Sequence, residues 1–246
     1  MRLKILKTGL LTLLTFVGLN CGGAPADTAT TPENETGEPT TVSSNEDETV
    51  IVENRQLEVA LEEQLRSRYE EMSLPTAFID KLVAARVELV IPDSFDGALP
   101  IGNDVWEYDY GLVSKSGKVD VRIKVLPGEI TEKNAQGNVI SVTNELMTTM
   151  IRLNGANLVA DIQDHPATEA SSRFNATKYT TGTFQPIPAF SDKPIASAGI
   201  FYKEGYGRVI VVALLNNLED GETRTEWITG ANAMRFADEP GEESAD

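Results

Sequence analysis

The sequence contains one cysteine, Cys21, and one histidine, His165, among 246 residues. A single cysteine excludes an intramolecular disulfide, so the stability of the fold has to come from packing. A single histidine leaves only carboxylates as partners for a catalytic or metal-binding imidazole. The chain therefore lacks the residues for a multi-histidine metal centre or a disulfide scaffold.

Basic residues are also scarce, with 21 Lys and Arg against 38 Asp and Glu and a formal net charge of −17. A net negative surface disfavours nucleic acid and anionic lipid headgroups. No basic cluster is longer than residues 122–124, where the charges alternate with an apolar residue. The sequence predicts no nucleic-acid partner.

No hydrophobic run near the N-terminus is long enough to span a membrane. Leu10–Leu19 is apolar and uncharged, and it follows three basic residues, Arg2, Lys4 and Lys7. This run is roughly half of the about 20 residues that a spanning helix requires. A basic start followed by a short apolar run indicates an export signal.

Cys21 follows this run directly. Residues 18–23 (GLNCGG) resemble the lipobox of bacterial lipoproteins, in which a Leu and small residues precede the cysteine. Leu19 sits one place late and Asn20 replaces the usual Gly, Ala or Ser, a relaxed form that resembles spirochaetal lipoproteins. The resemblance implies removal of residues 1–20 as a signal peptide, lipidation of Cys21, and attachment to membrane lipid through the acylated cysteine.

The same resemblance implies a place in the cell. In that family an Asp after the cysteine retains the protein at the inner membrane, and Gly22 stands there instead. The expected location is the cell envelope, lipid-anchored at the outer membrane, on its periplasmic face or at the cell surface. The alternative is an ordinary secretory signal cleaved near residues 24–26, which would leave Cys21 as a free thiol.

Two acidic segments flank the remaining chain. Residues 21–53 are rich in Thr, Glu, Pro, Gly and Ser and contain no Lys or Arg, and residues 238–246 repeat this composition. Such segments bury too little apolar area to offset the entropy of ordering, so we predict a disordered tether and a disordered tail. Residues 54–237 are left as a single domain.

Within that domain, apolar residues recur at helical spacing in four places. Leu57, Leu61, Leu65 and Tyr69 form a stripe that predicts an amphipathic helix over residues 54–72. Helices are also predicted at residues 76–85, at 141–154, and after residues 223–226, which fit a capping box. The last helix is expected to carry Trp227, Ile228, Ala231 and Met234.

Alternating and continuous apolar runs predict strands between these helices. One hairpin is expected from residues 106–112 and 119–125, and another from residues 195–202 and 208–215; single strands are expected at 87–92, 158–162 and 174–184. Val209–Leu215 is apolar throughout, as in a central strand covered on both faces. The predicted fold class is α+β, a largely antiparallel sheet flanked by helices.

This order of elements resembles the PsbP-like α/β/α sandwich, known from a photosystem extrinsic protein and from small bacterial lipoproteins. The resemblance depends on a strand that ends in Ile91–Pro92, a mid-domain helix, a long hairpin ending in Val209–Leu215, and a closing helix. It implies no catalytic residues.

His165 is the candidate for chemistry, with Asp161 or Asp164 as its carboxylate partner. Such a pair would make the protein an envelope hydrolase or a metal-dependent enzyme. No Gly-x-Ser-x-Gly elbow supports that function. The alternative is a structural histidine in a loop before Pro166.

Two loops are rich in oxygen ligands, residues 216–222 (NNLEDGE) and residues 93–97 (DSFDG). Calcium binds such oxygens, although neither loop has the EF-hand spacing. The favoured interpretation of the first loop is a solvated turn that caps the last helix. Residues 205–207 (GYG) lack the lysine of a phosphate-binding loop and predict a hairpin turn.

The aromatic residues Trp106, Tyr108 and Tyr110 either line a ligand groove or belong to the core. We predict no catalytic residue, no cofactor and no metal site. The leading hypothesis is a non-catalytic, membrane-anchored lipoprotein with a binding or assembly role toward an unknown protein or small-molecule ligand. The alternatives are the hydrolase or metal-dependent enzyme and a calcium-linked adhesion module.

Overall fold

The computed structural model describes residues 45–100, 102, 105–131, 133, 136–155 and 161–238, with side chains from Arg55 onward. The predicted signal segment, Cys21, most of the predicted tether and the tail beyond Asp238 lie outside these residues. Every helix in the described part of the chain is too short or too polar to cross a bilayer.

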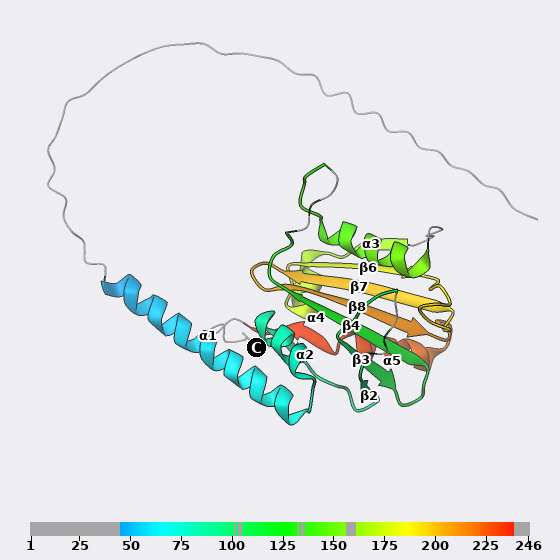
Figure 1. The fold of residues 1–246 in the computed structure, drawn as a ribbon, viewed down its shortest axis with the longest axis horizontal. Coiled ribbons are helices and arrows are strands. Elements are labelled where there is room, and N and C mark those ends of the chain that lie inside the picture. The colour runs from blue at the N-terminus through cyan, green and yellow to red at the C-terminus, as the bar shows by residue number, and fades with distance from the viewer. Residues whose placement is uncertain are drawn as a thin grey trace, which may run out of the picture. The chain divides into compact units, whose positions relative to one another are not determined.

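A seven-stranded antiparallel sheet forms the centre of the described domain, in the order β2-β3-β4-β8-β7-β6-β5 (Figure 1). Two further strands, β1 and β9, pair antiparallel in a separate small sheet. The strands are β1 (Val87–Leu89), β2 (Phe95–Ala98), β3 (Tyr110–Ser114), β4 (Val119–Pro127), β5 (Asp161–Asp164), β6 (Lys178–Phe184), β7 (Ile195–Lys203), β8 (Gly207–Leu215) and β9 (Met234–Phe236).

Helices cover both faces of the large sheet. One face packs against α3, and the other packs against α2, α4 and α5. The helices are α1 (Asn45–Glu71), α2 (Thr76–Ala84), α3 (Val142–Asn154), α4 (Ala167–Phe174) and α5 (Gly221–Ala231). The predicted fold class, α+β with an antiparallel sheet flanked by helices, is confirmed.

Strand β8 connects the two hydrophobic cores. All of its residues are buried. Because side chains alternate along a strand, Val209 and Val211 enter the core under α2 and α4, whereas Ile210 and Val212 enter the core under α3. The predicted central strand is therefore confirmed, and so is the hairpin that it forms with β7.

Helix α1 begins at Asn45, earlier than the predicted Asn54. Only the C-terminal part of its predicted stripe is buried: Leu65 and Tyr69 are 3% and 0% exposed, whereas Leu57 is 47% exposed. The Tyr69 hydroxyl donates to the Val87 carbonyl (2.6 Å) and accepts from the Leu89 amide (3.1 Å). The end of α1 is thereby tied to β1.

The predicted strand over residues 106–112 is shorter in the structure, where β3 begins at Tyr110. The carboxylate of Asp109 accepts a hydrogen bond from the Val125 amide (2.7 Å) and pairs with Lys81 (2.6 Å). A side chain therefore takes the place of a backbone acceptor at the point where the chain leaves the sheet.

The predicted strand over residues 174–184 was wrong at its start. Helix α4 occupies the chain up to Phe174, and Asn175 then adopts a left-handed conformation (φ 49°) that ends the helix. Strand β5 also lies later than the predicted 158–162, of which residues 158–160 are outside the described range. Helices α2 and α3 and the β7–β8 hairpin lie where they were predicted, and β3 and β4 form the other predicted hairpin with a later start.

The predicted start of the last helix was also wrong. Asp220, not Thr223, caps α5, and its side chain accepts from the Thr223 amide. Met234 does not extend this helix, because it pairs with Leu89 in the small sheet.

Candidate functional site

A cavity of about 510 Å³ opens on the sheet face between α4 and α5. This volume lies within the range of small-molecule sites, roughly 300–1,000 Å³. We call it the α4/α5 cleft. Phe174 and Tyr179 line it near α4, and Trp227 and Ile228 line it from α5.

The floor of the α4/α5 cleft consists of small and polar side chains from adjacent strands. Asp161 pairs with Thr183, and Gln163 with Thr181, so all four point to the same face of the sheet. Ser197 pairs with Thr183 from the other side. The floor therefore offers hydroxyl, amide and carboxylate groups at one level.

His165 forms one wall of this cleft. Its ring stacks on Tyr179 with centroids 4.4 Å apart. Nδ1 lies 3.1 Å from Glu169 Oε2, and Nε2 lies 2.8 Å from Thr181 Oγ1. Its backbone amide also donates to the Tyr179 carbonyl. Both ring nitrogens are thus engaged, and the ring is fixed in one orientation.

The carboxylate of Glu169 is shared between His165 and Arg173. Arg173 lies 3.0 Å from Glu169 Oε1, donates to Asn232 Oδ1 (2.9 Å), and places its guanidinium over the ring of Tyr179. The hydrogen bond with His165, and next that with Arg173, lowers the pKa of Glu169. Burial raises the pKa of the Tyr179 hydroxyl. The wall is held by a network that joins α4 and β6 to His165 before α4 and to Asn232 after α5.

The predicted partners of His165 were wrong. Asp164 accepts from Thr180 (2.6 Å) and Thr143 (3.0 Å) instead. Asp161 lines the cleft without a hydrogen bond to His165 in the described structure. The partner is Glu169, on a helix that the sequence analysis missed. A signal for α4 was present, because Pro166 precedes it, an acidic residue lies in its first turn and Arg173 in its last.

Thr181, His165 and Glu169 stand in the order hydroxyl, imidazole and carboxylate, as in a catalytic triad. Two features oppose that chemistry. The Thr181 amide lies inside the sheet, between β5 and β7, so it is not available to stabilise an oxyanion. Glu169 is also neutralised by Arg173. The arrangement suits a fixed wall better than a nucleophile.

The oxygen-rich loop at residues 216–222 caps α5, as the favoured interpretation of this loop predicted. Asp220 accepts from the Thr223 hydroxyl (2.8 Å) and from Lys118 (3.0 Å), and Glu222 also pairs with Lys118. These bonds, that with Thr223 first, lower the pKa of Asp220 to about 2. Among the described residues, no three His, Cys, Asp or Glu side chains gather as a metal site.

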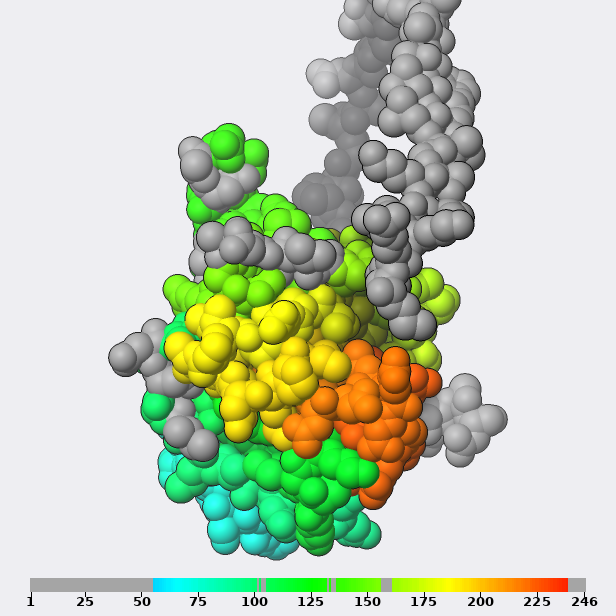
Figure 2. All heavy atoms as spheres, turned by 90° about the vertical axis from the view of Figure 1, so that its right-hand side faces the viewer, coloured from blue at the N-terminus to red at the C-terminus, as the bar shows by residue number. Residues whose placement is uncertain are grey.

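Lys193 links this loop to its neighbours, since it donates to the Gly117 carbonyl (2.9 Å) and to Asn216 (3.1 Å). Figure 2 shows the segments around residues 117 (green), 193 (yellow) and 216 (orange) side by side. The other oxygen-rich segment, at residues 93–97, is largely strand β2, where Asp96 lies 4.0 Å from Lys115. Neither of these described segments brings together three acidic side chains that could hold a cation.

The interpretation of Trp106, Tyr108 and Tyr110 as core residues is confirmed, and the three rings do not form one shared groove. Trp106 and Tyr108 belong to the core under α3, whereas Tyr110 stacks on Phe78 in the other core with centroids 5.0 Å apart. The three rings therefore lie on opposite faces of the sheet. Residues 205–207 form the hairpin turn between β7 and β8, as predicted.

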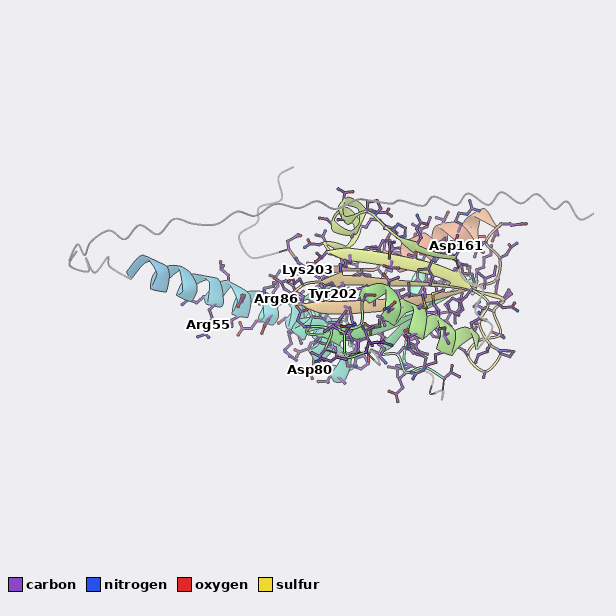
Figure 3. All side chains as sticks on the ribbon, turned by 90° about the horizontal axis from the view of Figure 1, so that it is seen from above. Arg55, Asp80, Arg86, Asp161, Tyr202 and Lys203 are labelled. Atoms are coloured by element: carbon purple, nitrogen blue, oxygen red, sulfur yellow. The ribbon has the colours of Figure 1, made fainter. Side chains whose placement is uncertain are left out.

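Figure 3 shows Asp161 at the end of the strands away from Tyr202 and Lys203. At that other end, the Tyr202 hydroxyl forms a hydrogen bond with Glu129. Burial first, and then this hydrogen bond, raises the pKa of the Tyr202 hydroxyl to about 12. Arg86 pairs with Glu58 (3.1 Å) nearby. Tyr202 and Arg86 both lie away from Asp161 (Figure 3).

No protein-family model matches the chain, and no curated protein matches it. The chain is similar to the solution structure of cyanobacterial PsbP (CyanoP) from Synechocystis sp. PCC 6803, with a TM-score of 0.38 and 13% identity, over 62% of this chain and 88% of that chain. A likeness of this size carries no conclusion about function. The PsbP-like arrangement in detail stays a prediction.

Proposed function

We propose that this protein is a membrane-anchored lipoprotein with a non-catalytic binding role at the cell envelope. The support for the anchor is the position of the sole cysteine, Cys21, directly after a short apolar run and before an acidic segment. Acyl chains stabilise membrane attachment by about 0.8 kcal/mol per buried methylene, and lasting attachment needs more than one chain. Location at the outer membrane is supported by Gly22, which stands where an inner-membrane lipoprotein of this kind has Asp.

The α4/α5 cleft is the proposed binding site. The observation that carries this role is that both His165 nitrogens are hydrogen-bonded within the wall, while the floor carries polar groups that face the cavity. A fixed wall and a polar floor suit binding, since pre-organisation lowers the entropy cost of association. Hydroxyl, amide and carboxylate groups beside Trp227 suit a small ligand rich in hydroxyl groups.

The anchor is tested by labelling cells with radioactive palmitate, with and without globomycin. The wild-type protein should take up label, and globomycin should cause the precursor to accumulate. Cys21→Ala should abolish the label, whereas Asn20→Gly, which places a usual small residue before the cysteine, should keep it. Label that survives Cys21→Ala would contradict the proposal.

The cleft is tested with glucose and N-acetylglucosamine as probes. In a Trp106→Phe variant, Trp227 is the sole tryptophan and reports on the cleft. A saturable change in its emission is expected, weakened by Gln163→Leu, with Gln136→Leu outside the cleft as the control. Absence of any change up to millimolar concentrations would contradict a hydroxyl-rich ligand in this cleft.

A hydrolase is the second candidate, because Thr181, His165 and Glu169 share hydrogen bonds in triad order. An activated-ester screen distinguishes the two functions. The binding role predicts no turnover above buffer, and the hydrolase predicts turnover that both His165→Ala and Thr181→Val remove. The calcium-linked adhesion module is not proposed, since Asp220 caps α5 and pairs with Lys118.

A further inference from the structure

A second cavity of about 350 Å³ lies on the opposite face of the sheet, between strands β4 and β8 and helix α3. Its volume is at the lower end of the range for small-molecule sites. We call it the α3 pocket. The proposed function in the α4/α5 cleft makes no use of it.

Three cations line the α3 pocket. Lys124 and Arg208 come from neighbouring strands, and Arg152 comes from the last turn of α3. Lys124 pairs with Ile210, two residues along β8 from Arg208, so the two cations are diagonal neighbours on one face. Side chains from three elements thus bring positive charge to one cavity.

One of these charges is neutralised inside the pocket. Arg208, which is 3% exposed, places Nε 2.5 Å from Oε2 of Glu145. The contact is an ion pair rather than a well-aligned hydrogen bond. A buried guanidinium needs such a partner, since its desolvation is costly. The Glu145–Arg208 pair therefore leaves the charge of Lys124 and Arg152 in excess.

No described carboxylate forms an ion pair with Lys124 or Arg152. The chain as a whole carries 38 acidic and 21 basic residues, so a cavity with an excess of positive charge departs from the overall charge balance of the chain. Two cations without acidic partners in one cavity of such a chain create a local positive potential. Cavity walls of low dielectric strengthen that potential toward an anion.

Apart from Thr148 and Thr149 of α3, the rest of the α3 pocket is apolar. Trp106, which is 4% exposed, forms one side, with the Lys124 ammonium 5.9 Å from its ring centroid. Aliphatic side chains form most of the remaining lining: Leu126, Ile130, Ile140 and Ile210. An apolar lining excludes inorganic anions as the best ligand, because they would leave these side chains unused.

We propose that the α3 pocket binds a small organic anion, a carboxylate on a compact apolar body. The carboxylate lies between Lys124 and Arg152, and the apolar body lies against Trp106 and the aliphatic lining. Charge-assisted hydrogen bonds fix the head, and burial of the body supplies the remaining affinity.

The experiment uses Trp227→Phe, which leaves Trp106 as the sole tryptophan. Cyclohexanecarboxylate is titrated while Trp106 emission is recorded. A saturable change is expected, and it should weaken with added salt. Cyclohexanecarboxamide, the neutral probe of the same shape, should bind at least tenfold more weakly. Equal binding of the amide, or no binding of the carboxylate, would overturn the proposal.

Variants in the same background locate the site. Lys124→Gln and Arg152→Gln should each raise the Kd about tenfold, a factor that corresponds to about 1.4 kcal/mol. Lys124→Arg should retain affinity. Arg55→Gln removes an exposed positive charge on α1 and is the control. With circular dichroism showing a folded chain, unchanged affinity in both Gln variants would overturn the proposal.

Discussion

At the residue scale, Tyr69 is a buried polar side chain whose hydroxyl is fully matched by backbone partners. The Tyr69 hydroxyl satisfies one backbone carbonyl and one backbone amide, at Val87 and Leu89, in a site with no exposed area. Burial is the largest contribution that raises the pKa of Tyr69, to about 12. A buried group that loses such partners costs more than the bond itself contributed.

Tyr69→Phe should therefore destabilise the fold by about 1–3 kcal/mol, because it leaves the amide of Leu89 and the carbonyl of Val87 unpaired. Urea unfolding followed by circular dichroism measures the change. Tyr202→Phe removes a more exposed hydroxyl and is the matched control, with a smaller expected loss. A loss no larger than that of the control would contradict the role of this hydroxyl.

Asp220 supplies a prediction about pH. Thr223 first, then Lys118, lowers its pKa from 3.8 to about 2. Because the folded pKa lies below the unfolded value, the unfolded chain binds the proton first as pH falls. The stability that the ionised Asp220 supplies is therefore present above about pH 4 and is lost as pH falls through about 2.

Asp220→Asn keeps a capping oxygen and removes the charge. Its urea midpoint should lie below that of the wild type at pH 6, and the gap should narrow as pH falls toward 2. Urea titrations at several pH values measure both midpoints. A gap that stays constant over this range would contradict the charge as its cause.

At the element scale, the turn between β7 and β8 depends on two glycines of different kinds. Gly205 has φ 80° with open space around it, whereas Gly207 has φ 132° and a Cβ there would lie 2.5 Å from the Leu126 carbonyl oxygen. The first position needs only the left-handed conformation. The second also needs room for the adjacent strand β4.

Gly207→Ala should therefore cost about 3 kcal/mol or more, because backbone strain adds to a clash with β4. Gly205→Ala should cost about 1–2 kcal/mol, the cost of a left-handed conformation alone. Chemical denaturation of both variants measures the difference. Equal losses would show that the approach of Leu126 is not the limiting contact.

The elements also show how far sequence patterns reach. Helix α3 was predicted well because Ser141 caps it, Gly155 ends it and its apolar residues keep one spacing. Helix α4 was missed because it is short and buries only Ala170 and Phe174. Because α4 was missed, Glu169 and Arg173 were not recognised as neighbours of His165, and the network around His165 was not predicted.

At the scale of the whole molecule, one sheet separates two cores that share β8. Trp106 reports on the core under α3, and Trp227 packs beside the core under α2, α4 and α5. Because β8 contributes side chains to both cores, unfolding of one core should also destabilise the other.

The variants Trp227→Phe and Trp106→Phe each leave one tryptophan as a reporter. The urea transition of each, followed by emission, should coincide with the transition of the same variant followed by far-ultraviolet circular dichroism. This result is expected because the domain unfolds as one cooperative unit. Separate transitions for the two probes would contradict a shared core.

The sequence by itself determined the features that depend on neighbours along the chain. Periodicity and turn residues predicted the fold class, the two hairpins and the central strand Val209–Leu215, because side-chain alternation is set by local backbone geometry. Only the tertiary structure decided which distant residues meet. It placed Glu169 and Thr181 on His165, set Trp106 and Tyr110 on opposite faces, and gathered Lys124, Arg152 and Arg208 in one pocket. Such pairings depend on strand order and helix packing, which leave no periodic pattern in the sequence.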